Sequence, residues 1–375
     1  MIETILITLL GVVATVYAAV LIKAVLWTRS LTSLQPAHSR LPRIAVIVAA
    51  RNEEQHLPAC LDALLTQNYP RDRIDVFVAN DHSTDRTTEV IDTYVEKTRA
   101  GNSSISIHRV DVPEPTSHLQ GKAQAIHTAI KACDHEYILI TDADCRPPDQ
   151  WAKMHAAYAA DDDIGMVCGH AYVSGSSVFA SVQALDWTFL LMIASMLAEE
   201  NHPLTAMGNN MGIKRETYEA TGGYPSLPFS VTEDYVLFKT VAERTPYRIR
   251  YPADPALCVH TLPETSFPAL YGQRRRWAWG GLDAPLWARC LYVIGFLVHL
   301  LPLLCLAVAP LFAAAVLLLK LLLDGSLLHA SLKLGSRTRH LSAFAAFEGY
   351  LFFYTITLPF VLLLFRRIRW KDRRF

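Results

Sequence analysis

Two aspartates separated by one residue follow an apolar stretch in the middle of the chain. Residues 137–141 read YILIT, and Asp142-Ala143-Asp144 come directly after them. Alternate residues of a strand point the same way, so both carboxylates can meet at one cation. Carboxylate oxygens favour Mg²⁺, Mn²⁺ or Ca²⁺ over Zn²⁺. Such a cation reverses the repulsion between carboxylates and a diphosphate, about 4 kcal/mol per charge pair at about 4 Å. The pattern indicates metal-bridged diphosphate binding, and a solvated acidic turn is the alternative.

A second acidic pair, Glu233-Asp234, precedes an apolar stretch with helical spacing. One interpretation is a general base that takes a proton from an acceptor hydroxyl. The other is a helix start, with Thr232 as the cap and the carboxylates matching the helix dipole. The pair alone does not decide between them.

A basic and aromatic segment, residues 273–277 (QRRRW), lies just before the apolar C-terminal third. Arginine presents its donors in a rigid fork that fits a phosphate. In that interpretation Arg276 contacts a departing diphosphate and Trp277 faces a sugar. The alternative is a juxtamembrane patch attracted to anionic lipid by about 1 kcal/mol per basic residue.

Apolar, β-branched runs alternate with helical patterns between residues 43 and 141. The expected strands are 44–50, 74–79, 105–110 and 137–141, and the expected helices are 53–66, 85–98 and 121–133. This alternation predicts an α/β fold with a mostly parallel sheet. Ligands bind at the carboxyl ends of such strands, and polar residues follow three of them: Arg51-Asn52-Glu53, Asn80-Asp81 and Asp142-Ala143-Asp144. No GxGxxG follows a strand, which argues against a dinucleotide-binding domain.

Both ends of the chain are apolar enough to enter a membrane. Residues 5–27 predict an uncleaved anchor, because Glu3 precedes the run and basic residues follow it, which places residue 30 onward in the cytosol. Residues 291–323 and 344–365 predict two or three further crossings. A tail with six basic residues at 366–374 should stay cytosolic, and that requires two crossings or a re-entrant segment. The expected division is 1–28 anchor, 29–42 linker, 43–285 catalytic domain, 286–366 membrane helices and 367–375 tail.

Residues 178–198 are also strongly apolar, but Gln183, Asp186 and Trp187 interrupt them. A carboxylate near the centre of a bilayer is costly, so an interfacial or groove-lining helix is expected rather than a membrane span. The formal net charge of zero gives no electrostatic case for nucleic acid. Seven widely spaced cysteines without a CxxC pair support neither a zinc site nor a disulfide framework.

Taken in order, these motifs resemble those of the family 2 inverting glycosyltransferases with a GT-A fold. The matching segments are AARNEE at 49–54, NDHSTD at 80–85 (where the family has DDxSxD), GKA at 121–123, DAD at 142–144, MGNNM at 207–211 with TGGY at 221–224, TED at 232–234 and QRRRW at 273–277. Ceramide glucosyltransferases and the processive cellulose, chitin and hyaluronan synthases carry the same D, DxD, TED and QxxRW set.

The resemblance implies a role for each matching residue. Asp234 would be the catalytic base, and Asp144 would bind Mg²⁺ or Mn²⁺, with Asp142 and His260 as further candidate ligands. The residues implied in nucleotide-sugar binding are Ala50, Glu53, Asp81, Lys122, Asp142 and Arg276. Those implied on the acceptor and diphosphate side are Glu233, Gln273 and Trp277. Asn80, in place of an acid, puts the nucleoside contacts in question. A structural histidine is the alternative for His260.

The implied reaction is a single transfer of a hexose from a nucleotide-diphosphate sugar, with UDP expected from the family, to a membrane lipid. A polysaccharide needs a lined channel through the bilayer, and three or four spans are few for that. A processive synthase that works as an oligomer or with a partner is the second hypothesis. A non-catalytic scaffold or transport subunit is the third, although both Asp144 and Asp234 are present. The expected location is a bacterial inner (cytoplasmic) membrane, with the catalytic domain in the cytosol.

Overall fold

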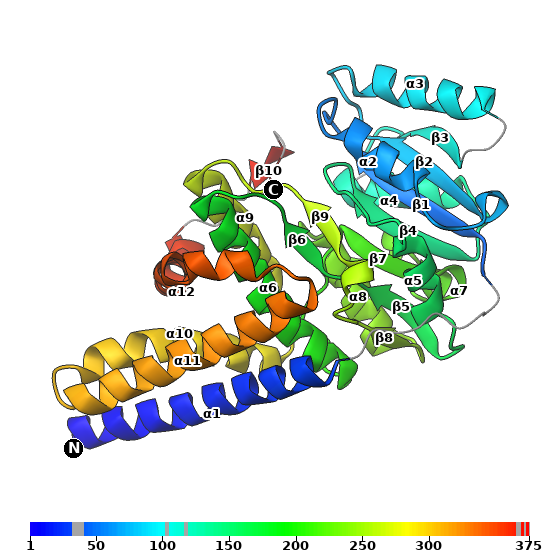
Figure 1. The fold of residues 1–375 in the computed structure, drawn as a ribbon. Coiled ribbons are helices and arrows are strands. Elements are labelled where there is room, and N and C mark those ends of the chain that lie inside the picture. Colours follow the sequence, from blue (N-terminus) through cyan, green and yellow to red (C-terminus); the bar gives the residue numbers. More distant parts are fainter. Residues whose placement is uncertain (32–40, 102–104, 116–118, 365–368, 371–372, 375) are drawn as a thin grey trace. The chain divides into compact units, whose positions relative to one another are not determined.

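The computed structural model covers residues 1–375 and describes all of them except 32–40, 102–104, 116–118, 365–368, 371–372 and 375 (Figure 1). The chain forms two compact units. The sheet unit comprises residues 33–172 and 197–262, and the helical unit comprises residues 1–32, 173–196 and 263–375. The expected linker at 29–42 and tail at 367–375 lie largely outside the described residues.

The sheet unit is built on a seven-stranded sheet in the order β3-β2-β1-β4-β7-β5-β8. Strands β1, β2, β3 and β4 run parallel, while β7 runs antiparallel to both β4 and β5. The bounds are Ile44–Ala50 (β1), Ile74–Asn80 (β2), Ser106–Asp111 (β3), Tyr137–Asp142 (β4), Ile164–Cys168 (β5), Asn210–Lys214 (β7) and Arg248–Arg250 (β8). Short strands β6 (Ala171–Val173) and β9 (Val259–Thr261) pair separately. The expected α/β class is confirmed.

Burial explains why the strands could be recognised in the sequence. The first five residues of β1 are fully buried, as an inner strand covered by helices on both faces must be. The helices are Leu57–Leu65 (α2), Thr87–Ala100 (α3), Gly121–Lys131 (α4), Trp151–Tyr158 (α5), Arg215–Ala220 (α7) and Glu233–Arg244 (α8). Helix α2 begins four residues later than expected, because Glu53 and Glu54 belong to the loop after β1.

The helical unit contains the apolar ends of the chain. Its helices are Ile2–Ser30 (α1), Val178–Glu199 (α6, whose last residues belong to the sheet unit), Phe267–Gly281 (α9), Leu286–Cys305 (α10), Pro310–Leu334 (α11) and Phe344–Leu364 (α12). The long apolar run at 291–323 is divided before Pro310, the first residue of α11, where a missing N–H costs nothing. Helices α1, α10 and α11 pack on one another, while α12 packs on α9 and α10 and is seen nearly end-on (Figure 1).

Among the described residues, five helices are long and apolar enough to cross a membrane: α1, α6, α10, α11 and α12. Helix α6 differs from the others, because 67% of its most apolar window is buried in protein, against 11–33% for the rest. Its burial favours a helix that faces protein over one that faces lipid.

The boundaries of the two compact units differ from the expected domain boundaries. The units divide the chain near residues 172 and 262, whereas the sequence predicted one continuous catalytic domain ending at residue 285. The extent of the catalytic domain therefore remains a prediction.

A buried polar network ties three of the apolar helices together. Lys320 Nζ of α11 contacts Asp324 Oδ2 at 2.7 Å and Glu348 Oε2 of α12 at 2.5 Å. Tyr17 of α1 donates to Asp324 Oδ1 at 2.6 Å. Charged groups survive inside apolar helices only when they are paired in this way.

Candidate functional site

The loops after β1 and β2 interlock at the carboxyl edge of the sheet. Asn52 and His82 follow neighbouring parallel strands, and both adopt left-handed backbone conformations, with φ of 54° and 53°. The Asn52 side chain accepts from the Thr84 amide at 2.8 Å, and the Asn52 amide donates to Ser83 Oγ at 3.2 Å. Such strained residues persist where the surrounding contacts fix them, which is common at functional sites.

The same loops hold the residues that the resemblance connects to the nucleoside. The Glu53 carboxylate lies 3.0 Å from His56 Nδ1, and Arg51 donates to the Asp81 carbonyl at 2.9 Å. The Ala50 carbonyl accepts from the Asp81 amide at 2.9 Å, so Ala50 links β1 to the second loop. Sequence reasoning did not single out Arg51, although an arginine at a strand end beside acidic loops is a signal for it.

Asn80, which stands where the family pattern has an acid, makes two hydrogen bonds in the loop after β2. Its Nδ2 donates to Thr88 Oγ1 at 3.0 Å, while its Oδ1 accepts from the Ser83 amide at 3.3 Å. The Asn80 amide donates to Thr88 here, whereas a carboxylate at this position would have to accept from the Thr88 hydroxyl. The asparagine therefore fastens the loop to the start of α3.

Lys122 stands at the centre of an acidic group. Gly121, with φ of 65°, begins α4 in a conformation that favours glycine, and Lys122 follows it. Lys122 Nζ lies 2.6 Å from Asp142 Oδ1 and 3.5 Å from Glu233 Oε1, and its side chain is 15% exposed. Burial lowers the pKa of Lys122, but Asp142, Glu233 and Asp234 act more strongly together and raise it. One ammonium group thus faces three carboxylates from β4 and α8.

The acidic pair at the start of α8 has two different environments. Asp234 Oδ2 accepts from the Gly208 amide at 2.7 Å, and Oδ1 accepts from the Tyr235 amide at 2.8 Å. Burial raises the pKa of Glu233 to about 7, and Asp234 adds to that shift while Lys122 opposes it. Gly208 was part of a recognised motif, but its contact with Asp234 was not expected.

The donor set at the end of β4 fits a hard cation in part. Asp142 and Asp144 are half-buried and alternate with the buried Ala143 and Cys145. The backbone of His260 pairs with that of Arg146, two residues after Asp144, and its ring packs edge-on against Tyr172. Within the described part of the chain, no three His, Cys, Asp or Glu side chains are grouped as a complete metal site. Two carboxylates suit an ion such as Mg²⁺, which takes its other ligands from phosphates and water.

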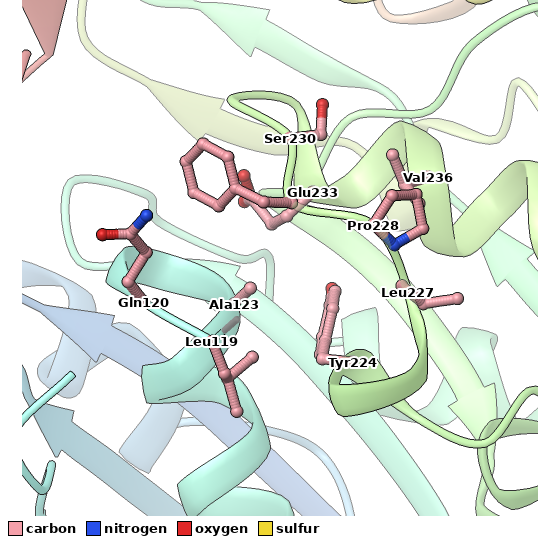
Figure 2. A pocket seen from close by; sticks show the side chains of 10 residues that line it. Leu119, Gln120, Ala123, Tyr224, Leu227, Pro228, Ser230, Glu233 and Val236 are labelled. Atoms are coloured by element: carbon pink, nitrogen blue, oxygen red, sulfur yellow. The ribbon is translucent and has the colours of Figure 1, made fainter. Parts of the chain in front are cut away.

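A shallow pocket opens beside Glu233 in the sheet unit (Figure 2). Its side chains come from two segments: Leu119, Gln120 and Ala123 around the start of α4, and Tyr224, Leu227, Pro228, Phe229, Ser230, Glu233 and Val236. The lining is mostly apolar, and Glu233 is its acidic member.

The QRRRW segment belongs to α9 in the helical unit. Gln273 Nε2 donates to Glu264 Oε1 at 2.9 Å, and Arg274 Nε donates to Asp186 Oδ2 at 2.7 Å. Trp277 packs edge-on against Trp187, with ring centroids 5.2 Å apart. The structure thus groups Asp142, Glu233 and Asp234 around Lys122 in the sheet unit. The residues Gln273, Arg276 and Trp277 belong to the helical unit.

Comparison with known proteins identifies the class. Residues 137–365 match the model of Glycosyl transferase family group 2, and residues 45–222 match Glycosyl transferase family 2. The first match covers more than half of the chain, which therefore belongs to the family 2 glycosyltransferases. The mostly parallel sheet is the one typical of the GT-A fold.

The chain resembles several particular members. It is 27% identical over 248 residues to the probable glycosyltransferase YdaM of Bacillus subtilis. The aligned region covers 64% of this chain and 55% of YdaM. It is 27% identical over 245 residues to the poly-β-1,6-N-acetyl-D-glucosamine synthase of Staphylococcus aureus, with the same shares. The chain thus spans about half the length of these curated relatives. The solved mannosyltransferase PcManGT of Pyrobaculum calidifontis shares the fold, with a TM-score of 0.58, 22% identity, and coverage of 92% of this chain and 98% of that one.

Proposed function

We propose that this protein is a metal-dependent inverting glycosyltransferase that moves a hexose from a nucleotide-diphosphate sugar to a hydroxyl of a membrane lipid. The observation that carries the proposal is the group around Lys122, where Asp142, Glu233 and Asp234 meet at the carboxyl edge of the sheet. The ammonium group can contact a diphosphate whose charge a bound cation offsets, and a carboxylate beside it can accept a proton from a hydroxyl.

The donor would bind at the ends of β1, β2 and β4. Asp144, with Asp142, would hold Mg²⁺ or Mn²⁺, and His260 is a further candidate ligand. When bound, the ion would offset charge on the departing diphosphate. Two observations support metal use: the half-buried carboxylates at 142 and 144, and the fold shared with PcManGT, which was solved in complex with GDP-Man and Mn²⁺. Glu53, Asp81 and Lys122 would contact the nucleotide sugar, and UDP remains the nucleotide we expect.

Asp234 would take the proton of the acceptor hydroxyl. The acceptor oxygen forms its bond to the anomeric carbon on the face opposite the diphosphate, the bond between that carbon and the phosphate oxygen breaks, and the configuration inverts. The Gly208 amide holds Asp234 Oδ2 at 2.7 Å and so fixes the direction of the carboxylate. Gln273, Arg276 and Trp277 would serve the acceptor and diphosphate side.

A lipid acceptor fits the apolar helices of the chain, but a second candidate function has support of its own. The similarity to poly-β-1,6-N-acetyl-D-glucosamine synthase favours processive polymer synthesis. The products separate the two functions, because single transfer puts one sugar on an organic-soluble lipid, whereas a processive enzyme makes a polymer that stays in the aqueous phase or precipitates.

For the membrane, we propose that α1 crosses from outside to inside, that α10 and α11 cross as a hairpin, and that α12 does not complete a crossing. Helices α1, α10 and α11 pack side by side, while α12 points in another direction (Figure 1). This arrangement keeps the basic tail in the cytosol, as the positive-inside rule requires. In this proposed topology the sheet unit would lie in the cytosol.

The central test incubates purified protein with a panel of radiolabelled sugar nucleotides and total membrane lipid, and measures the label in the organic phase. Asp144→Ala and Asp234→Asn should each lower turnover by about 10² or more while the protein stays folded. Full activity of Asp234→Asn would overturn the assignment of the base. A chelator should abolish transfer, and added Mn²⁺ or Mg²⁺ should restore it.

A further inference from the structure

Three side chains on one face of the apolar helix α6 contact the QRRRW segment or the turn before it. They are Gln183, Asp186 and Trp187, spaced three and four residues apart as helix neighbours on one face are. All three lie in the helical unit, as does the segment they touch. The other polar residues of α6 are Ser181, Thr188, Ser195 and Glu199, so Asp186 is the one carboxylate near the middle of the helix and requires a partner.

The first contact is a buried ion pair between α6 and α9. Arg274 is 3% exposed and Asp186 is 6% exposed. Arg274 Nε donates to Asp186 Oδ2 at 2.7 Å, and Arg274 Nη2 contacts the same oxygen. Of the three arginines in the segment, Arg274 is thus engaged inside the protein. A buried pair of this kind fixes geometry more reliably than it adds stability.

The second contact orders the glutamine of the same motif. Arg274 Nη1 donates to Gln273 Oε1, and Gln273 Nε2 donates to Glu264 Oε1 at 2.9 Å. Gln183 in turn bonds to the backbone of Glu264 through both ends of its amide, at 2.8 and 3.1 Å. The Gln273 amide is therefore fixed in one orientation by groups that depend on α6.

The third contact holds the tryptophan. The Arg274 guanidinium carbon lies 4.3 Å from the centroid of the Trp277 ring, within range of a cation–π interaction. Trp187 packs against the same indole at 63°, with centroids 5.2 Å apart. Asp186 orients the guanidinium, and the guanidinium covers one side of Trp277.

We infer that Asp186 is a positioning residue for Gln273 and Trp277, acting through Arg274, and that helix α6 sets the acceptor and diphosphate side of the enzyme. This inference rests on the proposed function for the roles of Gln273 and Trp277, but the contacts themselves do not. Loss of the Asp186 charge releases the guanidinium, and both motif side chains lose their fixed orientation.

The test labels the protein with 5-fluorotryptophan and follows the Trp277 resonance, which is assigned with Trp277→Phe. Asp186→Asn should shift or broaden that resonance and raise the KM for acceptor by about tenfold. Ser181→Ala is the matched control, because it removes a buried hydrogen bond from α6 to His340 and does not touch α9. It should leave both readouts unchanged.

A double variant separates positioning from folding. Asp186→Leu with Arg274→Met replaces the ion pair by apolar groups of similar volume and should fold, yet it should keep the shifted resonance and the raised KM. If the double variant restores both readouts, or if Asp186→Asn alters neither, the positioning role is refuted. If Asp186→Asn moves the resonance while Trp277→Phe leaves acceptor KM and turnover unchanged, the positioning contact stands and the proposed role of Trp277 fails.

Discussion

A methyl group on Gly208 would collide with the carboxylate of Asp234. A Cβ built on Gly208 lies 2.8 Å from Asp234 Oδ2, 2.9 Å from its Cβ and 3.1 Å from its Cγ, where ordinary contact begins at 3.4 Å. The backbone at Gly208 is not among the left-handed glycines, so alanine does not strain the main chain. The substitution Gly208→Ala therefore acts on Asp234 rather than on the fold.

The size of the effect follows from these distances. The carboxylate oxygen must retreat by about 0.6 Å, the difference between 3.4 and 2.8 Å. Rotation of the side chain is not enough, because the Asp234 Cβ is also too close, so the start of α8 must shift. A displacement of about 1 Å at a reacting group costs about 10²-fold in rate. Gly208→Ala should therefore lower kcat about ten- to a hundredfold, while the shift of α8 lowers the melting temperature by only a few degrees.

The assay is transfer of radiolabelled sugar at saturating donor, together with thermal unfolding of the detergent-solubilised protein. Gly349→Ala is the matched control, because a Cβ there meets nothing within 4 Å. In an Asp234→Ala background the base is already absent, so a shift of α8 has no base left to misplace and Gly208→Ala should lower kcat little further. Full kcat for Gly208→Ala, or an equal further loss in the Asp234→Ala background, would refute the reasoning.

Three other predictions concern stability and topology. Burial lowers the pKa of His135, but the opposing effects, led by the hydrogen bond to Asp75, outweigh it and raise this pKa to about 9, compared with about 6.5 in the unfolded chain. The protonated His135 should stabilise the folded protein fully below about pH 6.5, and this stabilisation should be lost as the pH rises through about 9. The melting temperature should fall over the same pH range, and Asp75→Asn should make it less dependent on pH. Lys320→Met should destabilise the protein by about 3–5 kcal/mol, because it leaves Asp324 and Glu348 buried without their cation, whereas Leu318→Ala on the exposed side should cost far less. A green fluorescent protein fused to the C-terminus should fluoresce, since it folds only in the cytosol, and a dark fusion would contradict the incomplete crossing of α12.

The sequence predicted those features that local pattern determines. Strands β1 and β2 were found within a residue, because residues buried on both faces leave continuous β-branched runs. The start of α2 was misplaced because Glu54 accepts from the Arg86 amide at 2.9 Å, a contact between segments that no local pattern records.

The residues of the candidate site could be recognised in the sequence from their types and motifs. The contacts between them could be predicted much less well. Asp142, Glu233 and Lys122 were all recognised, but their meeting joins β4, α8 and α4 across more than a hundred residues. Asp186 was noticed as a costly carboxylate in an apolar helix, yet its partner Arg274 lies 88 residues away. A sequence can show that a buried charge needs a partner, but only the packing of helices can select which one.

The charge around Lys122 determines how metal removal should act. One ammonium group faces the three carboxylates of Asp142, Glu233 and Asp234, so the described side chains at this point repel a bare diphosphate. If a divalent cation reverses that repulsion, it must be needed for donor binding and not for the chemical step alone. Titration calorimetry of the Asp234→Asn variant with UDP-sugar should therefore show heat of binding with Mn²⁺ and none with chelator. Donor binding of equal affinity in both conditions would show that the ion acts only on the leaving group, or not at all.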